Sequence, residues 1–240
     1  MLRKIVGLLG LAIPVILFTG SVVVGNCHEI QGSISGYYHT VMRDVFVGTL
    51  CIVGFFLFAY NGYRKEDKIA GELACLFALG VAFFPTSIDL PRTCCVIGTA
   101  SDNPLISKVH YISAALLFLD FTYFSLFLFT RSNGQETKEK KSRNKVYVFC
   151  GITMLLCIIL LGVYFAFFQD CTWLSDYKPV FYLESIALWA FGISWLTKGE
   201  LVLSDKPHLS HGNSNPIIVT GPTQSLKEQP DQDDIQQQHE

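Results

Sequence analysis

Six long apolar stretches follow one another along this chain of 240 residues, and they restrict its fold more than any other feature. Each stretch is about 17–25 residues long, enough for a helix to cross a hydrocarbon core of roughly 30 Å. Backbone inside a bilayer must satisfy its own hydrogen bonds, so each stretch is expected to be helical. The predicted spans are Ile5–Gly25, Thr40–Tyr60, Ile69–Ile88, Val109–Phe129, Val146–Phe168 and Pro179–Leu196.

The composition agrees with a chain that is surrounded by lipid. Only 16% of the residues are charged, against about 25% in soluble domains, and the mean hydropathy is +0.38. The chain has no basic face or motif typical of nucleic-acid binding, so the expected partner is the lipid bilayer. We predict an all-α bundle of six transmembrane helices over residues 1–200, in the cell membrane. Residues 201–240 are polar, with little to bury, and predict a disordered cytoplasmic tail.

Basic residues in the short loops predict the orientation of the bundle, because cytoplasmic loops carry an excess of Lys and Arg. The loops on the other side hold only Arg92, Lys108 and Lys178, with Arg43 at the boundary. We therefore expect both termini in the cytoplasm. The basic residues that fall together on the predicted cytoplasmic side are Arg3, Lys4, Arg64, Lys65, Lys68, Arg131, Lys138, Lys140, Lys141, Arg143 and Lys145.

Several ionisable and polar groups occur where spans meet the predicted non-cytoplasmic face. Charged groups near lipid cost free energy unless they reach water or partners, so we expect these groups to converge into one pocket at that face. Pro85 lacks an N–H and would free backbone carbonyls at the end of the third span to line the pocket. The candidate binding residues are Ser35, His39, Arg43, Asp44, Asp89, His110 and Glu184.

Three interpretations of this cluster remain open. It is a structural polar network, a site for a small molecule or lipid headgroup, or a metal site. Histidine nitrogens and carboxylate oxygens suit zinc, with His39, His110 and Asp89 as ligands. If the segment is one helix, the four-residue spacing of Ser35, His39 and Arg43 places them on one face.

Asp120 and several glycines lie inside the predicted spans, away from this cluster. Asp120 lies near the expected bilayer centre, where a carboxylate is a functional candidate, although a protonated Asp120 bonded to Thr122, Ser125 or a neighbouring span is the alternative. Glycines of the spans are expected at close contacts between helices. These glycines are Gly48, Gly54, Gly71 and Gly80.

The cysteines divide between the spans and the loops on the non-cytoplasmic side. Four of them fall in loops that face the oxidising compartment. At least one disulfide is expected among them, and the expected arrangement ties the second of these loops to Cys27 and Cys171. Free thiols are the alternative. The loop cysteines are Cys27, Cys94, Cys95 and Cys171.

Several short runs resemble an uncharacterised polytopic membrane family, domain-of-unknown-function nine-nine-eight. The resemblance covers most of residues 30–200 and implies a multi-span membrane protein without an established activity. The runs that carry it are Gly36–Gly48, Ala59–Tyr63 with Asp67 and Ala70-Gly71, Phe84-Pro85, His110–Ala115, and Glu184 with Phe191–Gly199.

A weaker likeness is to the alkaline ceramidase and progestin/adiponectin-receptor superfamily. Ser35 and His39 match the Ser-x-x-x-His of that group, and Asp89 or Asp44 stands for its Asp. The last span lacks the His-x-x-x-His of that superfamily, and the chain is one span short. The preferred expectation is a membrane protein that binds a small molecule or lipid headgroup at the non-cytoplasmic face. The alternative is a zinc-dependent intramembrane lipid hydrolase, and the sequence does not decide whether the chain is an enzyme.

Overall fold

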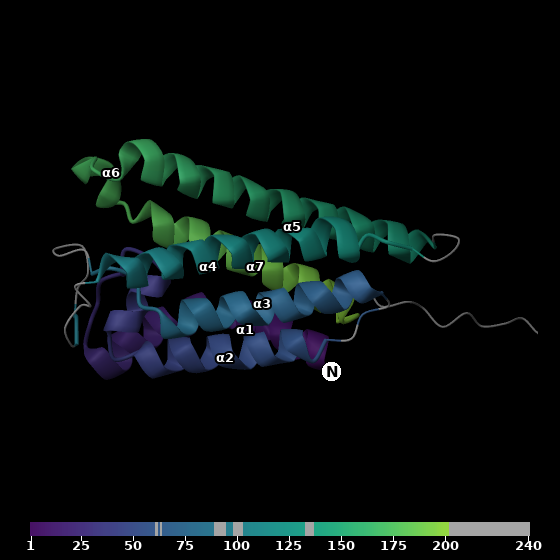
Figure 1. Cartoon of the computed structure of the whole chain (residues 1–240), viewed down its shortest axis with the longest axis horizontal. Helices are drawn as coiled ribbons and strands as arrows, with labels where there is room; N and C mark the ends of the chain where they lie inside the picture. Colours follow the sequence, from purple (N-terminus) through teal and green to yellow (C-terminus); the bar gives the residue numbers. More distant parts are fainter. Residues whose placement is uncertain (61, 63, 89–94, 98–102, 133–136, 202–240) are drawn as a thin grey trace, which may run out of the picture. The chain divides into compact units, whose positions relative to one another are not determined.

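The computed structural model describes residues 1–60, 62, 64–88, 95–97, 103–132 and 137–201. These residues form helices and connections, with no strand among them. The main helices lie side by side (Figure 1). They are α1 (Leu2–Gly25), α2 (Arg43–Phe58), α3 (Lys65–Phe83), α4 (Pro104–Tyr123), α5 (Lys138–Val163) and α7 (Pro179–Lys198), with the short α6 (Thr172–Ser175) before α7.

Three shorter helical turns complete the bundle. The 3₁₀ turn η1 (Ser35–His39) precedes α2, while the π-helical turns η2 (Phe124–Leu128) and η3 (Tyr164–Phe168) extend α4 and α5. Asn103 caps α4 by accepting the N–H of Leu105 at 2.9 Å, and Thr137 caps α5 through the N–H of Lys140 at 3.1 Å. Each of these side chains satisfies a backbone donor at a helix start.

Within the described part of the chain, four helical stretches are long and apolar enough to cross a membrane. They are Leu2–Gly25, Pro104–Leu128, Lys138–Phe168 and Pro179–Lys198. The all-helical, membrane-protein character that the sequence predicts is therefore present. The helix α2 is not among them: its 16 residues extend about 24 Å at 1.5 Å per residue, less than a hydrocarbon core of roughly 30 Å.

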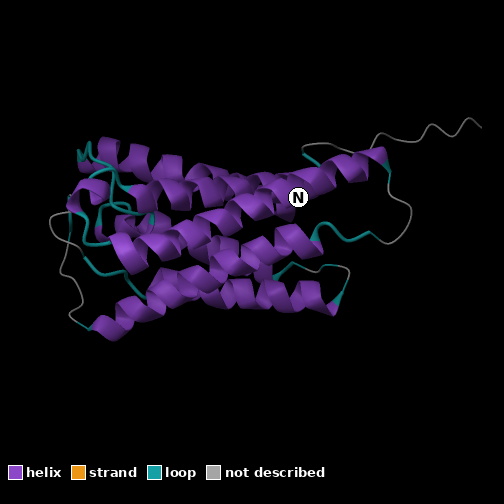
Figure 2. Ribbon diagram, turned by 90° about the horizontal axis from the view of Figure 1, so that it is seen from above, coloured by secondary structure: helices purple, strands orange, loops and turns teal. Residues whose placement is uncertain are grey.

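Around the bundle the helices follow the order α1, α2, α3, α4, α5 and α7, and α7 packs back on α1. Figure 2 shows the connections gathered at the two ends of the bundle. We call one end the disulfide end, because Cys27 and Cys95 are bonded there. The opposite end holds Arg3, Arg64 and Lys140, and we call it the basic end.

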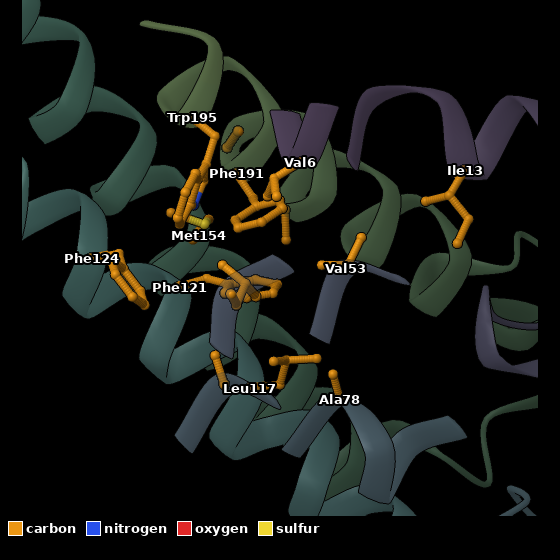
Figure 3. Packing of buried hydrophobic residues seen from close by; sticks show 14 of the residues in the cluster. Val6, Ile13, Val53, Ala78, Leu117, Phe121, Phe124, Met154, Phe191 and Trp195 are labelled. Atoms are coloured by element: carbon orange, nitrogen blue, oxygen red, sulfur yellow. The ribbon is translucent and has the colours of Figure 1, made fainter. Parts of the chain in front are cut away.

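Aromatic side chains fill the centre of the bundle. Trp195 of α7 is fully buried, and its ring centroid lies 5.1 Å from that of Tyr60 and 5.2 Å from that of Phe129. Phe121 and Phe191 stack with centroids 3.8 Å apart, in the cluster of Figure 3. Such pairs contribute about 0.5–1.5 kcal/mol each beyond their buried area, so they tie α4, α7 and the end of α2 together.

The helices α1 and α7 approach closely at a pair of glycines, Gly7 and Gly192. A Cβ built on Gly7 would lie 2.8 Å from the carbonyl oxygen of Gly192, and one on Gly192 would lie 2.7 Å from that of Gly7. Small residues at helix crossings bring backbones into van der Waals contact, which drives helix association in lipid. Of the four glycines expected at close contacts, Gly54, Gly71 and Gly80 place a built Cβ against a neighbouring helix, so the expectation is confirmed for them. It is wrong for Gly48, where no heavy atom lies within 4 Å of a built Cβ.

We expect Gly192→Ala to lower the midpoint of thermal unfolding in detergent, because the added methyl group meets a backbone carbonyl that cannot rotate away. Overpacking of this kind costs about 1–3 kcal/mol. Gly162→Ala on α5 is the control, since a built Cβ there has nothing within 4 Å. Equal midpoints for the two variants would contradict the close crossing of α1 and α7.

Candidate functional site

Two backbone carbonyls become available where α3 ends at the disulfide end. Pro85 disfavours helical conformation in the residue before it, and Phe84 is extended, with φ −103° and ψ 110°. The Nδ1 of His110 lies 2.7 Å from the Phe84 carbonyl oxygen, and the Nε2 of His39 lies 2.8 Å from that of Thr86. An imidazole bonded to a carbonyl donates its N–H, so both histidines are held on a single turn of backbone.

Uncharged side chains that the sequence reasoning missed complete this network. The hydroxyl of Thr86 donates to the Tyr111 oxygen at 2.8 Å, and Ser87 lies 2.8 Å from the same oxygen. Tyr111 follows His110 directly, so one turn of α4 contributes both an imidazole and a phenol. The proline in the sequence identifies the freed carbonyls, whereas hydroxyl groups carry no charge that would mark them in advance.

Glu184 holds the connection between α1 and α2 inside the bundle. Its Oε2 accepts the N–H of Ile34 at 2.6 Å, and the backbone of Ser35 is a second partner. One turn earlier on α7, the N–H of Phe181 donates to the Gly32 carbonyl at 3.2 Å. These bonds satisfy backbone groups of a loop that would otherwise lose free energy on burial.

The same carboxylate lines a cavity of about 60 Å³ between α1, α2, α3, α4 and α7. Ser35 and Thr49 are polar, and the remaining lining is apolar, including Leu117 and Phe121. A carboxylate offers about four acceptor positions, so Glu184 can accept a further donor from a molecule in the cavity. The structure thus places Glu184 and Ser35 at one hollow and the two histidines on the α3 carbonyls.

Two of the predicted binding residues lie on the surface. Arg43 is exposed and donates to the hydroxyl of Tyr38 at 3.1 Å, with its guanidinium 4.8 Å from the centre of the same ring. Asp44 is exposed in the first turn of α2, where a negative charge is favourable.

The expectation that Ser35, His39 and Arg43 share one helix face is wrong, because the helix is interrupted at Thr40. Thr40 is extended, and its hydroxyl donates to the backbone carbonyl of Tyr37 at 2.9 Å and accepts the N–H of Met42 at 3.2 Å. Threonine hydroxyls compete in this way with helical hydrogen bonds. Buried His39 and exposed Arg43 therefore belong to separate helical segments.

The metal hypothesis rests partly on a residue outside the described part of the chain. Asp89, the third expected ligand, lies in the segment that the structure does not describe. Among the described residues, no three His, Cys, Asp or Glu side chains are grouped closely enough to hold a metal ion. Zinc binding by His39, His110 and Asp89 stays a prediction.

Asp120 lies apart from both groups. Its Oδ2 is buried and has no hydrogen-bond partner among the described residues. The two side chains expected to bond it are engaged elsewhere, since Thr122 donates to the Phe118 carbonyl at 2.9 Å and Ser125 lies 2.7 Å from the hydroxyl oxygen of Ser194. Its role as an intramembrane carboxylate stays a prediction.

The cysteines at this end include one bonded pair. Cys27 and Cys95 form a disulfide across 68 residues of sequence, which joins the end of α1 to the connection between α3 and α4. The expectation of at least one disulfide is met by this pair. The expected link of the second loop to Cys171 is not formed, because Cys171 is a free thiol in the structure. Cys94 lies outside the described residues.

Burial lowers the pKa of His39 below its ordinary value, and the positive charge of Arg43 lowers it further, whereas the hydrogen bond to Thr86 raises it. The folded protein therefore keeps His39 neutral at a pH where the unfolded chain takes up a proton. Stability from this group is present above the unfolded pKa of about 6.5. It is lost as the pH falls through the folded pKa.

As the pH is lowered from about 7 to 5, we expect the unfolding free energy of His39→Gln to fall less than that of the unchanged protein, because glutamine takes up no proton on unfolding. The difference is at most about 1.4 kcal/mol per pH unit, the limit for one titrating group. Glutamine retains an N–H donor for Thr86, and His110 is present in both proteins. The measurement is denaturant unfolding in detergent at each pH. His28→Gln, at an exposed site of the same end, should behave as the unchanged protein, and an equal pH response in all three proteins would contradict the neutral state of His39.

Comparisons with protein families, with curated proteins and with solved structures found no match to this chain.

Proposed function

We propose that this chain is a six-span integral protein of the cell membrane that binds a small amphipathic molecule or lipid at the disulfide end of its bundle. Four of the spans meet the length and apolarity that crossing requires. The other two, α2 and α3, pack between α1 and α4. Their large apolar side chains are exposed as a lipid-facing surface would be, at Ile52, Phe55, Phe58, Ile69, Leu73 and Leu76.

The basic end faces the cytoplasm in this proposal. Even numbers of spans return the chain to its starting side, so the first turn of α1 and the last turn of α7 lie at the same end. The concentration of Lys and Arg at that end favours the cytoplasmic side. The disulfide end then faces the oxidising compartment, where a bond such as Cys27–Cys95 persists.

Reporter fusions test this orientation. A reporter active only in the cytoplasm should be active when fused after Glu200 and when inserted near residue 134. It should be inactive when inserted at Asp176, in the connection between α6 and α7. Activity at Asp176, or its absence after Glu200, would overturn the six-span arrangement with cytoplasmic termini.

The cavity beside Glu184 carries the binding proposal. Its lining is apolar except at Glu184, Ser35 and Thr49, so it suits an apolar tail joined to a hydrogen-bond donor. Its free volume of about 60 Å³ is below the roughly 150 Å³ of an apolar cavity known to admit benzene. The cavity therefore suits only the short segment of an alkyl chain next to an amine or hydroxyl group that donates to Glu184, and the rest of the chain would extend out of the cavity.

A long-chain amino alcohol with a diazirine on its alkyl chain is a suitable probe of purified protein in detergent. We expect light-dependent labelling of residues around Leu117, competition by the unlabelled amino alcohol, and loss of most labelling in Leu117→Trp, which fills the cavity. Leu156→Trp, on the exposed face of α5, should label normally. Glu184→Gln should weaken competition by the amino alcohol more than competition by the corresponding alkane. Labelling that Leu117→Trp leaves unchanged would overturn the proposal.

One observation favours the alternative of a zinc-dependent lipid hydrolase. Each histidine of the pair bonds a backbone carbonyl through one ring nitrogen, as metal-bound histidines commonly do through the nitrogen opposite the metal. Zinc bound to purified protein in equal molar amount, and lost in both His39→Ala and His110→Ala, would favour the hydrolase over the binding protein.

A further inference from the structure

A second and larger cavity, of about 350 Å³, lies at the basic end of the bundle. Two carboxylates belong to its lining, Asp67 and Glu200, and six cationic side chains surround them, an excess of four positive charges. The cations come from five separate parts of the chain. They are Arg3, Arg64, Arg131, Lys140, Arg143 and Lys198.

Aromatic rings and a backbone carbonyl hold three of these cations in place. Lys140 donates to the Phe129 carbonyl at 2.7 Å, and the nitrogen of Lys198 lies 5.2 Å from the centre of the Phe129 ring. The guanidinium of Arg3 lies 5.4 Å from the ring centre of Tyr60. Both rings are buried. A cation over a ring is positioned and stabilised by the ring, so these contacts fix cations around the cavity.

Two acidic residues near the cavity, Asp67 and Glu66, contact residues of its lining. The Asp67 carboxylate accepts the backbone N–H of Arg64 at 3.0 Å, at the start of α3. Glu66 pairs with Arg131 at 3.7 Å, where both side chains are partly exposed. Arg3, Lys140, Arg143 and Lys198 are half-buried, whereas Arg64 and Arg131 are exposed. Four of the lining cations are thus half-buried, and the two exposed ones mark the mouth of the cavity.

The helix ends make this charge more unusual. Arg3, Arg64 and Lys140 lie at or beside the first turns of α1, α3 and α5, where the helix dipole is already positive. Cations there are unfavourable for folding. A preference for basic cytoplasmic loops accounts for Lys and Arg on this side, but it does not require them to converge on one hollow.

We propose that this cavity binds a ligand carrying two or more phosphate charges, either the headgroup of an anionic phospholipid or a soluble phosphate ester. Lys and Arg bind phosphate through charge-assisted hydrogen bonds, Arg often through two at once. Basic pockets between transmembrane helices suit phosphorylated lipid headgroups, and this cavity opens at the end of the spans, where headgroups lie. The cavity is separate from the Glu184 cavity, so the proposal is independent of the function proposed for the disulfide end.

Titration of the purified full-length protein in detergent with three probes tests this site. The probes are dioctanoyl phosphatidylinositol 4,5-bisphosphate, inositol trisphosphate and dioctanoyl phosphatidylcholine. We expect saturable binding of the bisphosphate lipid, weakened by added salt, and no binding of phosphatidylcholine. Binding of inositol trisphosphate with similar affinity would assign the site to soluble phosphate esters, and binding of the lipid alone would assign it to a headgroup. Absence of binding by both phosphorylated probes would overturn the proposal.

Charge-matched variants on one helix locate the binding. We expect Lys140→Gln/Arg143→Gln to raise the Kd for the phosphorylated probe at least about tenfold, as loss of charge-assisted hydrogen bonds implies. Lys141→Gln/Lys145→Gln removes two exposed charges from the same helix, and should change the Kd less than about threefold. Arg131→Gln, at the exposed mouth, serves if the first variant fails to fold, and should also weaken binding. Equal weakening by the lining and control variants would show a general attraction to basic surface and overturn the assigned site.

Discussion

The hydrogen bond from the Ile34 backbone to the Glu184 carboxylate, at 2.6 Å, determines how the disulfide end is built. The segment between α1 and α2 is too buried to be an ordinary surface loop, since Gln31 and Tyr37 are fully inaccessible. Buried backbone groups without partners cost free energy comparable to a lost hydrogen bond. Glu184 supplies a partner from α7, 150 residues away in the sequence, so one buried carboxylate allows a polar loop to enter the helical core.

Other contacts of this loop follow from the same requirement. The N–H of Ile97 donates to the His39 carbonyl at 2.8 Å, while the His39 ring bonds Thr86. The Cys27–Cys95 disulfide fixes the two connections at another point. A loop that is joined to α7, to the end of α3 and to the next connection holds these helices in a fixed arrangement. The cavity beside Glu184 depends on that arrangement, because these helices line it.

Much of this architecture could be predicted from the sequence, because hydrophobic length and proline have local physical consequences. The main helices lie on the six predicted apolar stretches, and the carbonyls freed near Pro85 receive both predicted histidines. The interruption at Thr40 was not predictable in the same way, since a threonine hydroxyl bonds local backbone only when the surrounding loop is folded. Nor does the position of a glycine within an apolar stretch reveal whether it meets a neighbouring helix, as the contrast between Gly48 and Gly192 shows.

The two ends use polar residues in opposite ways. At the disulfide end His39 and His110 bond backbone carbonyls, and Glu184 accepts a backbone N–H that burial would otherwise leave without a partner. At the basic end, cations gather around a hollow and against the positive ends of three helix dipoles, an arrangement that opposes folding. Glu66, Asp67 and Glu139, in the first turns of α3 and α5, offset part of the free energy that the clustered cations cost. An anion that binds only the folded protein would recover more of that free energy.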